Sequence, residues 1–156
     1  MIYLFWICFF LIIYSYFIFP MTVILFGKNK ELNSNIYNKI DEIPSLSILI
    51  AAYNEQSIIK EKVMSIINSN FPTDKIEIII GSDCSTDNTN EIIKKLAEEY
   101  PFIIAINFEK RTGKSGVVNR LVKRAKSDIL IITDANIIFS ENTISSLIQH
   151  FKNPQI

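Results

Sequence analysis

Side chains with metal-binding chemistry follow a short apolar run late in this sequence. Residues 129–132 lead into Thr133-Asp134-Ala135-Asn136, which offers a carboxylate and an amide oxygen. Oxygen ligands of this kind suit hard divalent cations such as Mg²⁺ or Mn²⁺. Asp134 is therefore a candidate metal ligand, directly or through water, and Asn136 is a candidate second ligand. The alternative is that Asp134 and Asn136 only form a turn.

An earlier apolar run, residues 46–52, ends in Tyr53-Asn54-Glu55. The ring of Tyr53 can pack against a flat base, and Asn54 or Glu55 can hydrogen-bond a ribose or a base edge. Taken alone, these residues favour a simpler interpretation, in which Asn54 caps the following helix.

The run at residues 76–80 leads into a polar cluster that ends at Thr89. Thr86 or Asp87 suits the N-cap of the next helix. Asp83 is not needed for that cap, and its carboxylate can accept an N–H from a pyrimidine imide. A calcium loop is excluded, because the cluster lacks the required glycine and Lys94 stands where such a loop needs glutamate.

Residues 109–116 combine cations with glycines at the expected start of a helix. The cations are Lys110, Arg111 and Lys114, and the glycines are Gly113 and Gly116. A helix N-terminus with this composition can hold a diphosphate. The spacing does not match a P-loop, and a solvated basic turn is the alternative.

Hydrophobic periodicity predicts how these clusters are positioned. Strands are expected at 46–52, 76–80, 102–108 and 129–132, and helices at 57–68, 87–100, 116–126 and 141–151. This alternation predicts an α/β fold with right-handed βαβ units and a mainly parallel sheet. Ligands of such sheets bind beyond the carboxyl ends of the strands, where all four clusters fall. A nucleotide diphosphate with Mg²⁺ or Mn²⁺ matches every cluster.

The first part of the chain has a different character. Residues 2–26 carry no charged side chain and exceed the roughly 20 residues that span a bilayer. They predict a retained transmembrane helix, with a signal peptide or a buried helix as alternatives. Lys28 and Lys30 follow this stretch, which predicts a single-pass membrane protein whose C-terminal part is cytoplasmic. Residues 27–44 are expected to form a juxtamembrane linker, and 45–156 the folded domain.

Charge argues against nucleic acid as a partner. Lysine and arginine number 16, aspartate and glutamate also number 16, and the net charge is zero. The basic residues do not form a long patch with interleaved aromatics, which nucleic-acid binding favours.

Four motifs in order resemble glycosyltransferase family 2, the membrane-associated GT-A enzymes that include cellulose, chitin, hyaluronan and poly-N-acetylglucosamine synthases. The resemblance covers residues 44–156. It depends on SILIAAYNE at 47–55, SDCSTDNT at 82–89, RTGK at 111–114 and TDAN at 133–136.

The resemblance implies a role for each site residue. Tyr53 and Glu55 would line the nucleoside pocket, and Asp83 would bind uracil or another base. Arg111 and Lys114 would meet the nucleotide and its diphosphate. Asp134 would begin the metal-binding Asp-x-Asp element of the family. The implied reaction is inverting transfer of a sugar from a nucleotide sugar, expected to be a UDP-sugar, to a hydroxyl of an acceptor glycan or lipid during polysaccharide or glycoconjugate synthesis.

The chain also departs from the family pattern. Cys84 stands where the family usually has glycine, so the geometry of its loop is in question if that position needs a positive φ. Asn136 replaces the second acid of the metal element. The general base, the Gln-x-x-Arg-Trp element and further membrane helices are expected beyond Ile156, so no catalytic residue is predicted within this chain. The resemblance is thus to the donor-binding, N-terminal half of a truncated GT-A domain. Two alternatives stay open: a fragment that binds nucleotide sugars without transferring them, and a membrane-anchored domain that has lost its function.

Overall fold

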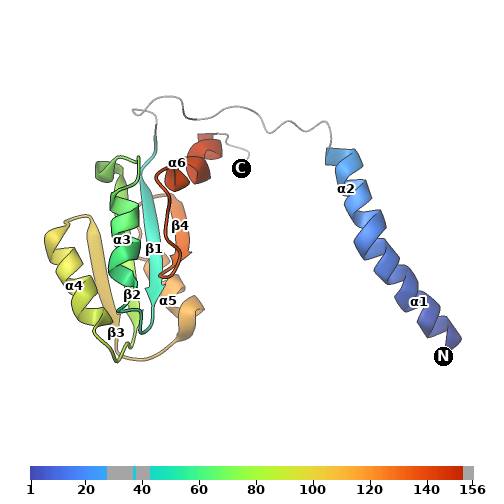
Figure 1. Cartoon of the computed structure of the whole chain (residues 1–156), viewed down its shortest axis with the longest axis horizontal. Helices are drawn as coiled ribbons and strands as arrows, with labels where there is room; N and C mark the ends of the chain where they lie inside the picture. The colour runs from blue at the N-terminus through green and yellow to red at the C-terminus, as the bar shows by residue number, and fades with distance from the viewer. Residues whose placement is uncertain (28–36, 38–42, 153–156) are drawn as a thin grey trace. The chain divides into compact units, whose positions relative to one another are not determined.

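Figure 1 shows the computed structural model of the chain, which describes residues 1–27, 37 and 43–152. The contacts divide the chain into an N-terminal helical unit and a globular unit that begins at Ile36, and each is described by itself. The predicted linker, residues 27–44, lies almost entirely outside the described residues, as do the two lysines that follow the apolar stretch.

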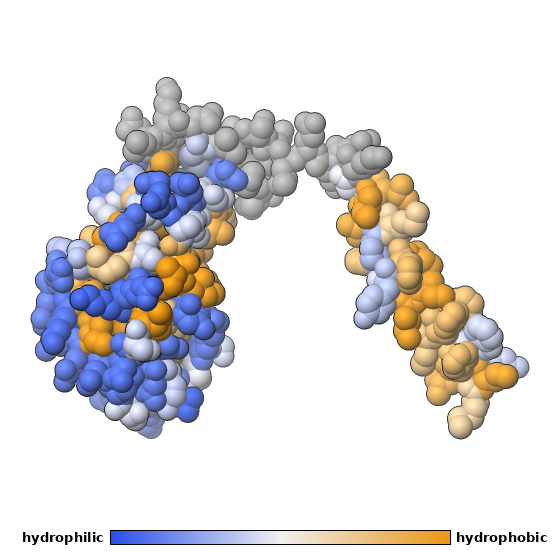
Figure 2. Space-filling model, viewed as in Figure 1, coloured by the Kyte–Doolittle hydropathy of each residue, from blue (hydrophilic) through white to orange (hydrophobic). Residues whose placement is uncertain are grey.

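The N-terminal unit is one continuous helix with an irregular turn in its middle. It comprises α1 (Ile2–Ile13), a π-helical turn (Tyr14–Ile18) and α2 (Phe19–Gly27). Pro20 explains the wide turn, because its ring displaces the carbonyl one turn earlier and it has no N–H to donate. The helix has a mean hydropathy of 2.3 in its most apolar window, and none of that window is buried. Figure 2 shows hydrophobic residues along its length. By length and composition it is a candidate membrane span.

The globular unit contains a four-stranded parallel sheet in the order β3-β2-β1-β4. The strands are β1 (Leu46–Ala52), β2 (Ile76–Asp83), β3 (Ile103–Phe108) and β4 (Ile129–Asp134). The predicted α/β architecture is confirmed. The predicted ends of β2 and β4 were wrong, because small and polar residues after the apolar runs continue to pair with β1. As a result, Asp83 and Asp134 are the last residues of two strands that flank β1.

Helices connect the strands. They are α3 (Ile59–Ile67), α4 (Thr89–Glu99), α5 (Gly113–Val122) and α6 (Thr143–Ile148), and a 3₁₀ turn (Gln149–Lys152) follows α6. The predicted start of α5 was wrong by three residues. The helix already begins at Gly113, because an acid from β2 holds its first backbone N–H groups.

The sheet is covered on both faces (Figure 1). Leu46, Ile48 and Ile50 of β1 point to the larger core, which contains the buried residues of α3, α4 and α6. Leu49 points to the opposite face, where α5 packs. Gly81 of β2 allows this helix to come close, because a Cβ at that position would lie 2.6 Å from the side chain of Val117. Two contacts with β2 therefore position α5: the hydrogen bonds of Asp83 at its start and the close packing of Val117 on Gly81.

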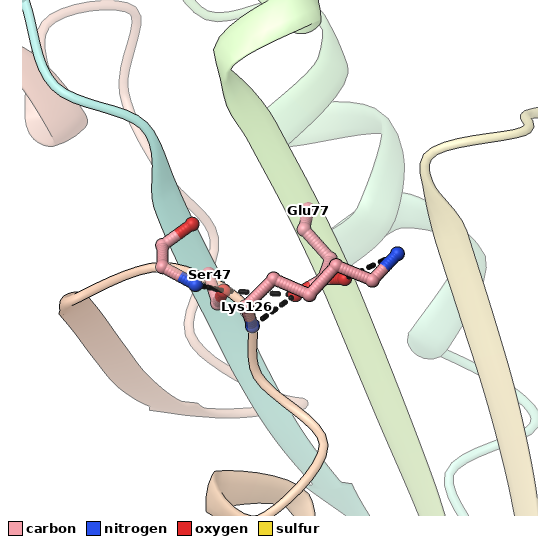
Figure 3. A network of polar contacts seen from close by, with 4 residues as sticks. Ser47, Glu77 and Lys126 are labelled. Carbon is pink, nitrogen blue, oxygen red and sulfur yellow. Dashed lines mark hydrogen bonds and ion pairs between the residues drawn. The ribbon is translucent and has the colours of Figure 1, made fainter.

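A polar network holds the opposite end of the sheet (Figure 3). Glu77 Oε2 accepts hydrogen bonds from Ser47 Oγ at 2.8 Å and from the backbone N–H of Lys126 at 3.2 Å. Glu77 Oε1 lies 3.7 Å from Lys126 Nζ. These bonds connect β1 and β2 to the segment between α5 and β4, which explains why Glu77 interrupts the isoleucine run of β2.

The β4 edge of the domain exposes apolar side chains. Ile132 of β4 is 53% exposed, and Ile137, Ile138 and Leu147 are also exposed. Figure 2 shows hydrophobic residues at the side of the domain where β4 and α6 lie. β4 is an edge strand of the sheet, so this side of β4 has no strand partner among the described residues.

Candidate functional site

A pocket lies at the carboxyl ends of the strands, where the sequence placed the site. All six residues predicted to contact a nucleotide sugar line it, together with the second candidate metal ligand. The lining includes Tyr53, Glu55, Asp83, Arg111, Lys114, Asp134 and Asn136, with Gly113, Val117 and several alanines between them. The structure thus brings together residues from the ends of β1, β2 and β4 and from the start of α5.

Asp83 organises the floor of this pocket. Its side chain is buried, with 4% of its surface exposed. Oδ1 accepts hydrogen bonds from the backbone N–H of Thr112 at 2.7 Å and from its hydroxyl at 3.3 Å. Oδ2 accepts the N–H of Gly113 at 2.8 Å. A carboxylate at this position accepts hydrogen bonds from N–H groups that the first turn of a helix leaves without partners. Its negative charge also interacts favourably with the positive end of the helix dipole. The sequence did not predict this contact, because the cap comes from a strand 29 residues earlier.

Arg111 and Tyr53 form one side of the pocket. The guanidinium carbon of Arg111 lies 3.8 Å from the centre of the Tyr53 ring, a cation–π contact. The guanidinium lies over one face of the Tyr53 ring, so that face is not open to a base.

Lys114 and Asp134, which also line the pocket, form an ion pair. Their side chains are 60% and 43% exposed, so the contact is open to solvent and carries little stabilisation of its own. Asn136, two residues further on, is exposed beside it. The pair therefore joins the start of α5 to the end of β4 through a contact that a ligand can replace.

Asn54 does not cap α3, contrary to the simpler interpretation of the sequence. Its Oδ1 accepts the N–H of Thr86 at 2.8 Å, and its own N–H donates to Ser85 Oγ at 3.1 Å. Asn54 adopts a φ of 53°, a conformation that asparagine tolerates better than most residues. Its neighbour Glu55 donates its backbone N–H to Thr89 Oγ1 at 2.9 Å. These bonds tie the loop after β1 to the loop after β2, so that Tyr53 and Asp83 keep fixed relative positions.

Cys84 adopts a positive φ of 60° directly after Asp83. This is the left-handed region of the backbone, where a residue with a Cβ is strained and glycine is not. Its thiol lies 3.6 Å from the carbonyl oxygen of Glu109. The cysteine that stands where the family pattern has glycine therefore causes backbone strain directly after β2.

Lys62 of α3 is a residue that the predictions from sequence did not include. Its side chain is fully buried. Nζ donates to Thr133 Oγ1 at 3.1 Å and to the carbonyl oxygen of Ile137 at 2.5 Å, and it lies 3.4 Å from the centre of the Phe139 ring. Burial lowers the pKa of Lys62 to about 8, although the carboxylate of Asp134 acts in the opposite direction. The position of Lys62 was a usable signal, because it follows Ile59 by three residues and lies on the same helix face as Val63 and Ile66.

The oxygen atoms of the pocket suit a metal ion that is also held by the phosphates of a substrate. The described residues contain no group of three or more His, Cys, Asp or Glu side chains that could hold a metal ion. Asp134 and Asn136 nevertheless supply a carboxylate and an amide oxygen on the same turn. Mg²⁺ is usually held by one or two carboxylates together with substrate phosphates, and not by a cage of protein ligands alone. The residues present fit that arrangement.

Comparison with known proteins gives a consistent result. The model of the family described as "Glycosyl transferase family 2" matches residues 47–156. The poly-beta-1,6-N-acetyl-D-glucosamine synthase of Staphylococcus aureus is 31% identical over 130 residues, which cover 83% of this chain and 30% of that protein. The probable glycosyltransferase YdaM of Bacillus subtilis is 32% identical over 98 residues, or 61% of this chain and 23% of that protein. The chain thus spans less than a third of these relatives.

Solved structures share the fold. The mannosyltransferase PcManGT of Pyrobaculum calidifontis, in complex with GDP-Man and Mn²⁺, superposes with a TM-score of 0.75 at 23% identity, covering 92% of this chain and 43% of that one. TarS of S. aureus in complex with UDP-GlcNAc gives a TM-score of 0.59 at 24% identity, covering 66% of this chain and 30% of that one. These likenesses establish a GT-A arrangement of strands and helices.

Cys84→Gly is expected to raise the free energy of unfolding by up to about 1 kcal/mol. Glycine relieves the left-handed strain at this position, and the greater freedom of the unfolded chain offsets part of the gain. Cys84→Ala is the matched control, because it removes the thiol but keeps the Cβ. Chemical denaturation of the chain in detergent measures both variants. Equal stabilities of the glycine and alanine variants would contradict the proposed strain.

The lowered pKa of Lys62 predicts that the free energy of unfolding rises at alkaline pH. Its pKa is about 8 in the folded protein, whereas the ordinary value of 10.5 applies to the unfolded chain. Between these values the unfolded chain binds more protons than the folded one, so the free energy of unfolding increases with pH, by about 3 kcal/mol over the whole window. Denaturation of wild type and Lys62→Met at pH 7.5, 9 and 10.5 isolates this contribution. The stability difference between them should shift in favour of wild type as the pH rises, and a constant difference would contradict the assignment.

Proposed function

Because this chain belongs to glycosyl transferase family 2, we propose that its pocket binds the nucleotide diphosphate part of a sugar donor. The observation that carries the proposal is the convergence of aromatic, acidic and basic residues from four separate segments in one pocket. The base, the ribose and the diphosphate with its cation each have a chemically matched group there. A UDP-sugar is the proposed donor, and the nucleotides named for the structural neighbours, UDP-GlcNAc and GDP-Man, support the ligand class.

The base and ribose are assigned to the side that Tyr53 and Asp83 form. The ring of Tyr53 offers an aromatic surface, and stacking of Arg111 on it leaves the base either the free face of the ring or the plane of the guanidinium. The carboxylate of Asp83 accepts three hydrogen bonds from Thr112 and Gly113. A carboxylate has about four lone-pair sites, so one remains for an imide N–H of the base. Glu55 borders the same side and can accept a ribose hydroxyl.

The diphosphate and its cation are assigned to the opposite side, where Lys114 and Asp134 are paired. When a diphosphate enters, Lys114 can turn from Asp134 to a phosphate oxygen, which frees the carboxylate of Asp134 for the cation. A bound Mg²⁺ or Mn²⁺ would neutralise the charge that develops on the departing diphosphate. Asp134 would hold the cation, directly or through water, and Asn136 would offer an amide oxygen. One protein ion pair is exchanged for two contacts with the ligand, which makes nucleotide and metal binding cooperative.

Sugar transfer itself is a proposal for the whole protein. The family resemblance supports inverting transfer to a hydroxyl of a glycan or lipid acceptor, with a general base that lies beyond Ile156. The pocket contains acids, but each one near the donor has a partner or a ligand role already. The alternative is a fragment that binds nucleotide sugars without transferring them. Measuring transfer and hydrolysis of UDP-sugars by the 156-residue chain separates the two, because robust transfer would reject the fragment hypothesis.

The helix at Ile2–Gly27 is proposed to anchor the domain in a membrane, with the pocket on the cytoplasmic side. Its length and hydropathy support insertion. The lysines that follow it support the orientation. A cytoplasmic site would have direct access to the nucleotide sugars of the cell.

Binding of UDP in the presence and absence of Mn²⁺ tests the proposed site. Wild type should bind UDP more tightly when Mn²⁺ is present. Asp134→Asn should remove most of this enhancement while leaving metal-free UDP affinity unchanged or improved, because Lys114 is released. Asp83→Ala should weaken UDP binding with and without metal, because it removes a base contact and the cap of α5. Calorimetry on the chain in detergent gives these affinities, and wild-type affinity in both variants would refute the site.

Lys114→Met gives the complementary result. Removing the ammonium should weaken UDP binding about tenfold or more, the range for a lost hydrogen bond between charged groups. It should also strengthen the binding of Mn²⁺ without nucleotide, because Asp134 loses its internal partner. Lys110→Met is the matched control, since Lys110 is an exposed lysine of the same turn that does not line the pocket. If the two variants behave alike, Lys114 has no specific role.

A further inference from the structure

The buried ammonium of Lys62 has no place in donor binding as described so far. It lies behind the turn that carries Asp134 and Asn136, and it is not part of the pocket lining. Its two acceptors stand on either side of that turn. Thr133 Oγ1 precedes Asp134 by one residue, and the carbonyl of Ile137 follows Asn136 by one residue.

The same helix holds the turn at a second point. Ser65 Oγ accepts the backbone N–H of Phe139 at 3.1 Å and donates to the carbonyl oxygen of Lys62 at 2.7 Å. The ring of Phe139 is largely buried and lies against the ammonium of Lys62. Ala135, at the centre of the turn, is 2% exposed and belongs to the main core. The turn is thus fixed at its start, middle and end, while its two polar side chains face the pocket.

Packing alone does not account for a lysine at this position. A buried ammonium has a large desolvation cost, and a methionine or leucine would fill similar volume without it. The lysine differs from these in its hydrogen bonds, which reach a hydroxyl and a carbonyl on the two sides of the turn. A hydrophobic side chain could not determine the distance between those two groups.

We propose that Lys62 is a positioning residue, which holds the Asp134–Asn136 turn in the shape that presents the carboxylate and amide oxygens together to the cation of the donor. This inference rests on the proposed function. It assigns to α3 a role in metal affinity, although no side chain of α3 lines the pocket. Residues that orient metal ligands from behind typically change metal affinity by about 10- to 100-fold when they are replaced.

The test compares UDP affinity with and without Mn²⁺ in the full chain in detergent. The ratio of the two affinities measures the metal contribution, and a variant that is merely less stable leaves it unchanged. In Lys62→Met the ratio should fall about tenfold or more, while metal-free UDP affinity should stay within about twofold, since the contacts on the base side are untouched. Direct titration of Mn²⁺ followed by electron paramagnetic resonance should show the same loss without nucleotide.

Leu96→Ala is the matched control for lost stability. Leu96 is a core residue of α4 with 3% exposure, and its truncation should cost about 2–5 kcal/mol. It does not line the pocket, and it lies on α4 and not on α3, whose side chains bond the turn. We expect this variant to be less stable than wild type and to keep the wild-type ratio. A similar fall of the ratio in Leu96→Ala would overturn the positioning role.

Thr133→Val keeps the test decisive if Lys62→Met does not fold. It is nearly isosteric and removes the hydroxyl that accepts from Lys62. Its ratio should fall about threefold or more, and the double variant should lose less than the sum of the single changes, because both remove the same bond. A folded Lys62→Met or Thr133→Val with the wild-type ratio overturns the inference alone. Absence of UDP binding in wild type overturns the proposed function and the inference with it.

Discussion

The hydrogen bonds between the carboxylate of Asp83 and the start of α5 are the interaction on which the rest of the site depends. They join the end of β2 to the backbone N–H groups of Thr112 and Gly113. The residues on either side of this cap are Arg111 and Lys114. The cap therefore sets where the guanidinium meets Tyr53 and where the ammonium meets Asp134. Without it, the basic turn would be a solvated loop whose charges have no defined position.

The acids and cations of the pocket form a chain of contacts and not a single cluster. Asp83 holds α5, α5 presents Lys114, and Lys114 pairs with Asp134, while Lys62 holds the turn behind Asp134. The inner contacts are buried or partly buried, whereas the pair at the pocket surface is exposed. Exposed pairs are weak because solvent screens them. A charged ligand can therefore replace the outer contact while the inner ones keep the geometry.

Sequence patterns predicted the architecture because β-branched runs and helical periodicity report burial directly. They also predicted which residues converge, since strands of a parallel sheet all end at one edge. They missed what depends on contacts between distant segments. Asp83 was predicted to bind a base, but its second contact, the cap of a helix that begins at Gly113, was not foreseen. Asn54 was expected to cap its own helix, yet it bonds Thr86. The periodicity of α3 puts Lys62 on the buried face, but its charge made it look like a surface residue, because lysine is almost never fully buried without a partner.

Two of the costly features among the described residues occur where the pocket is built. Cys84 takes a left-handed conformation directly after Asp83, and Lys62 is buried directly behind the turn of Asp134. Both features lower stability, and each lies next to an acid that ends a strand. The surrounding hydrogen bonds from α5, from Glu109 and from Thr133 hold them in place. At the opposite end of the sheet, Glu77 instead satisfies the hydrogen bonds of its neighbours. Costly features that lie beside both acids are typical of a region shaped by ligand binding more than by stability.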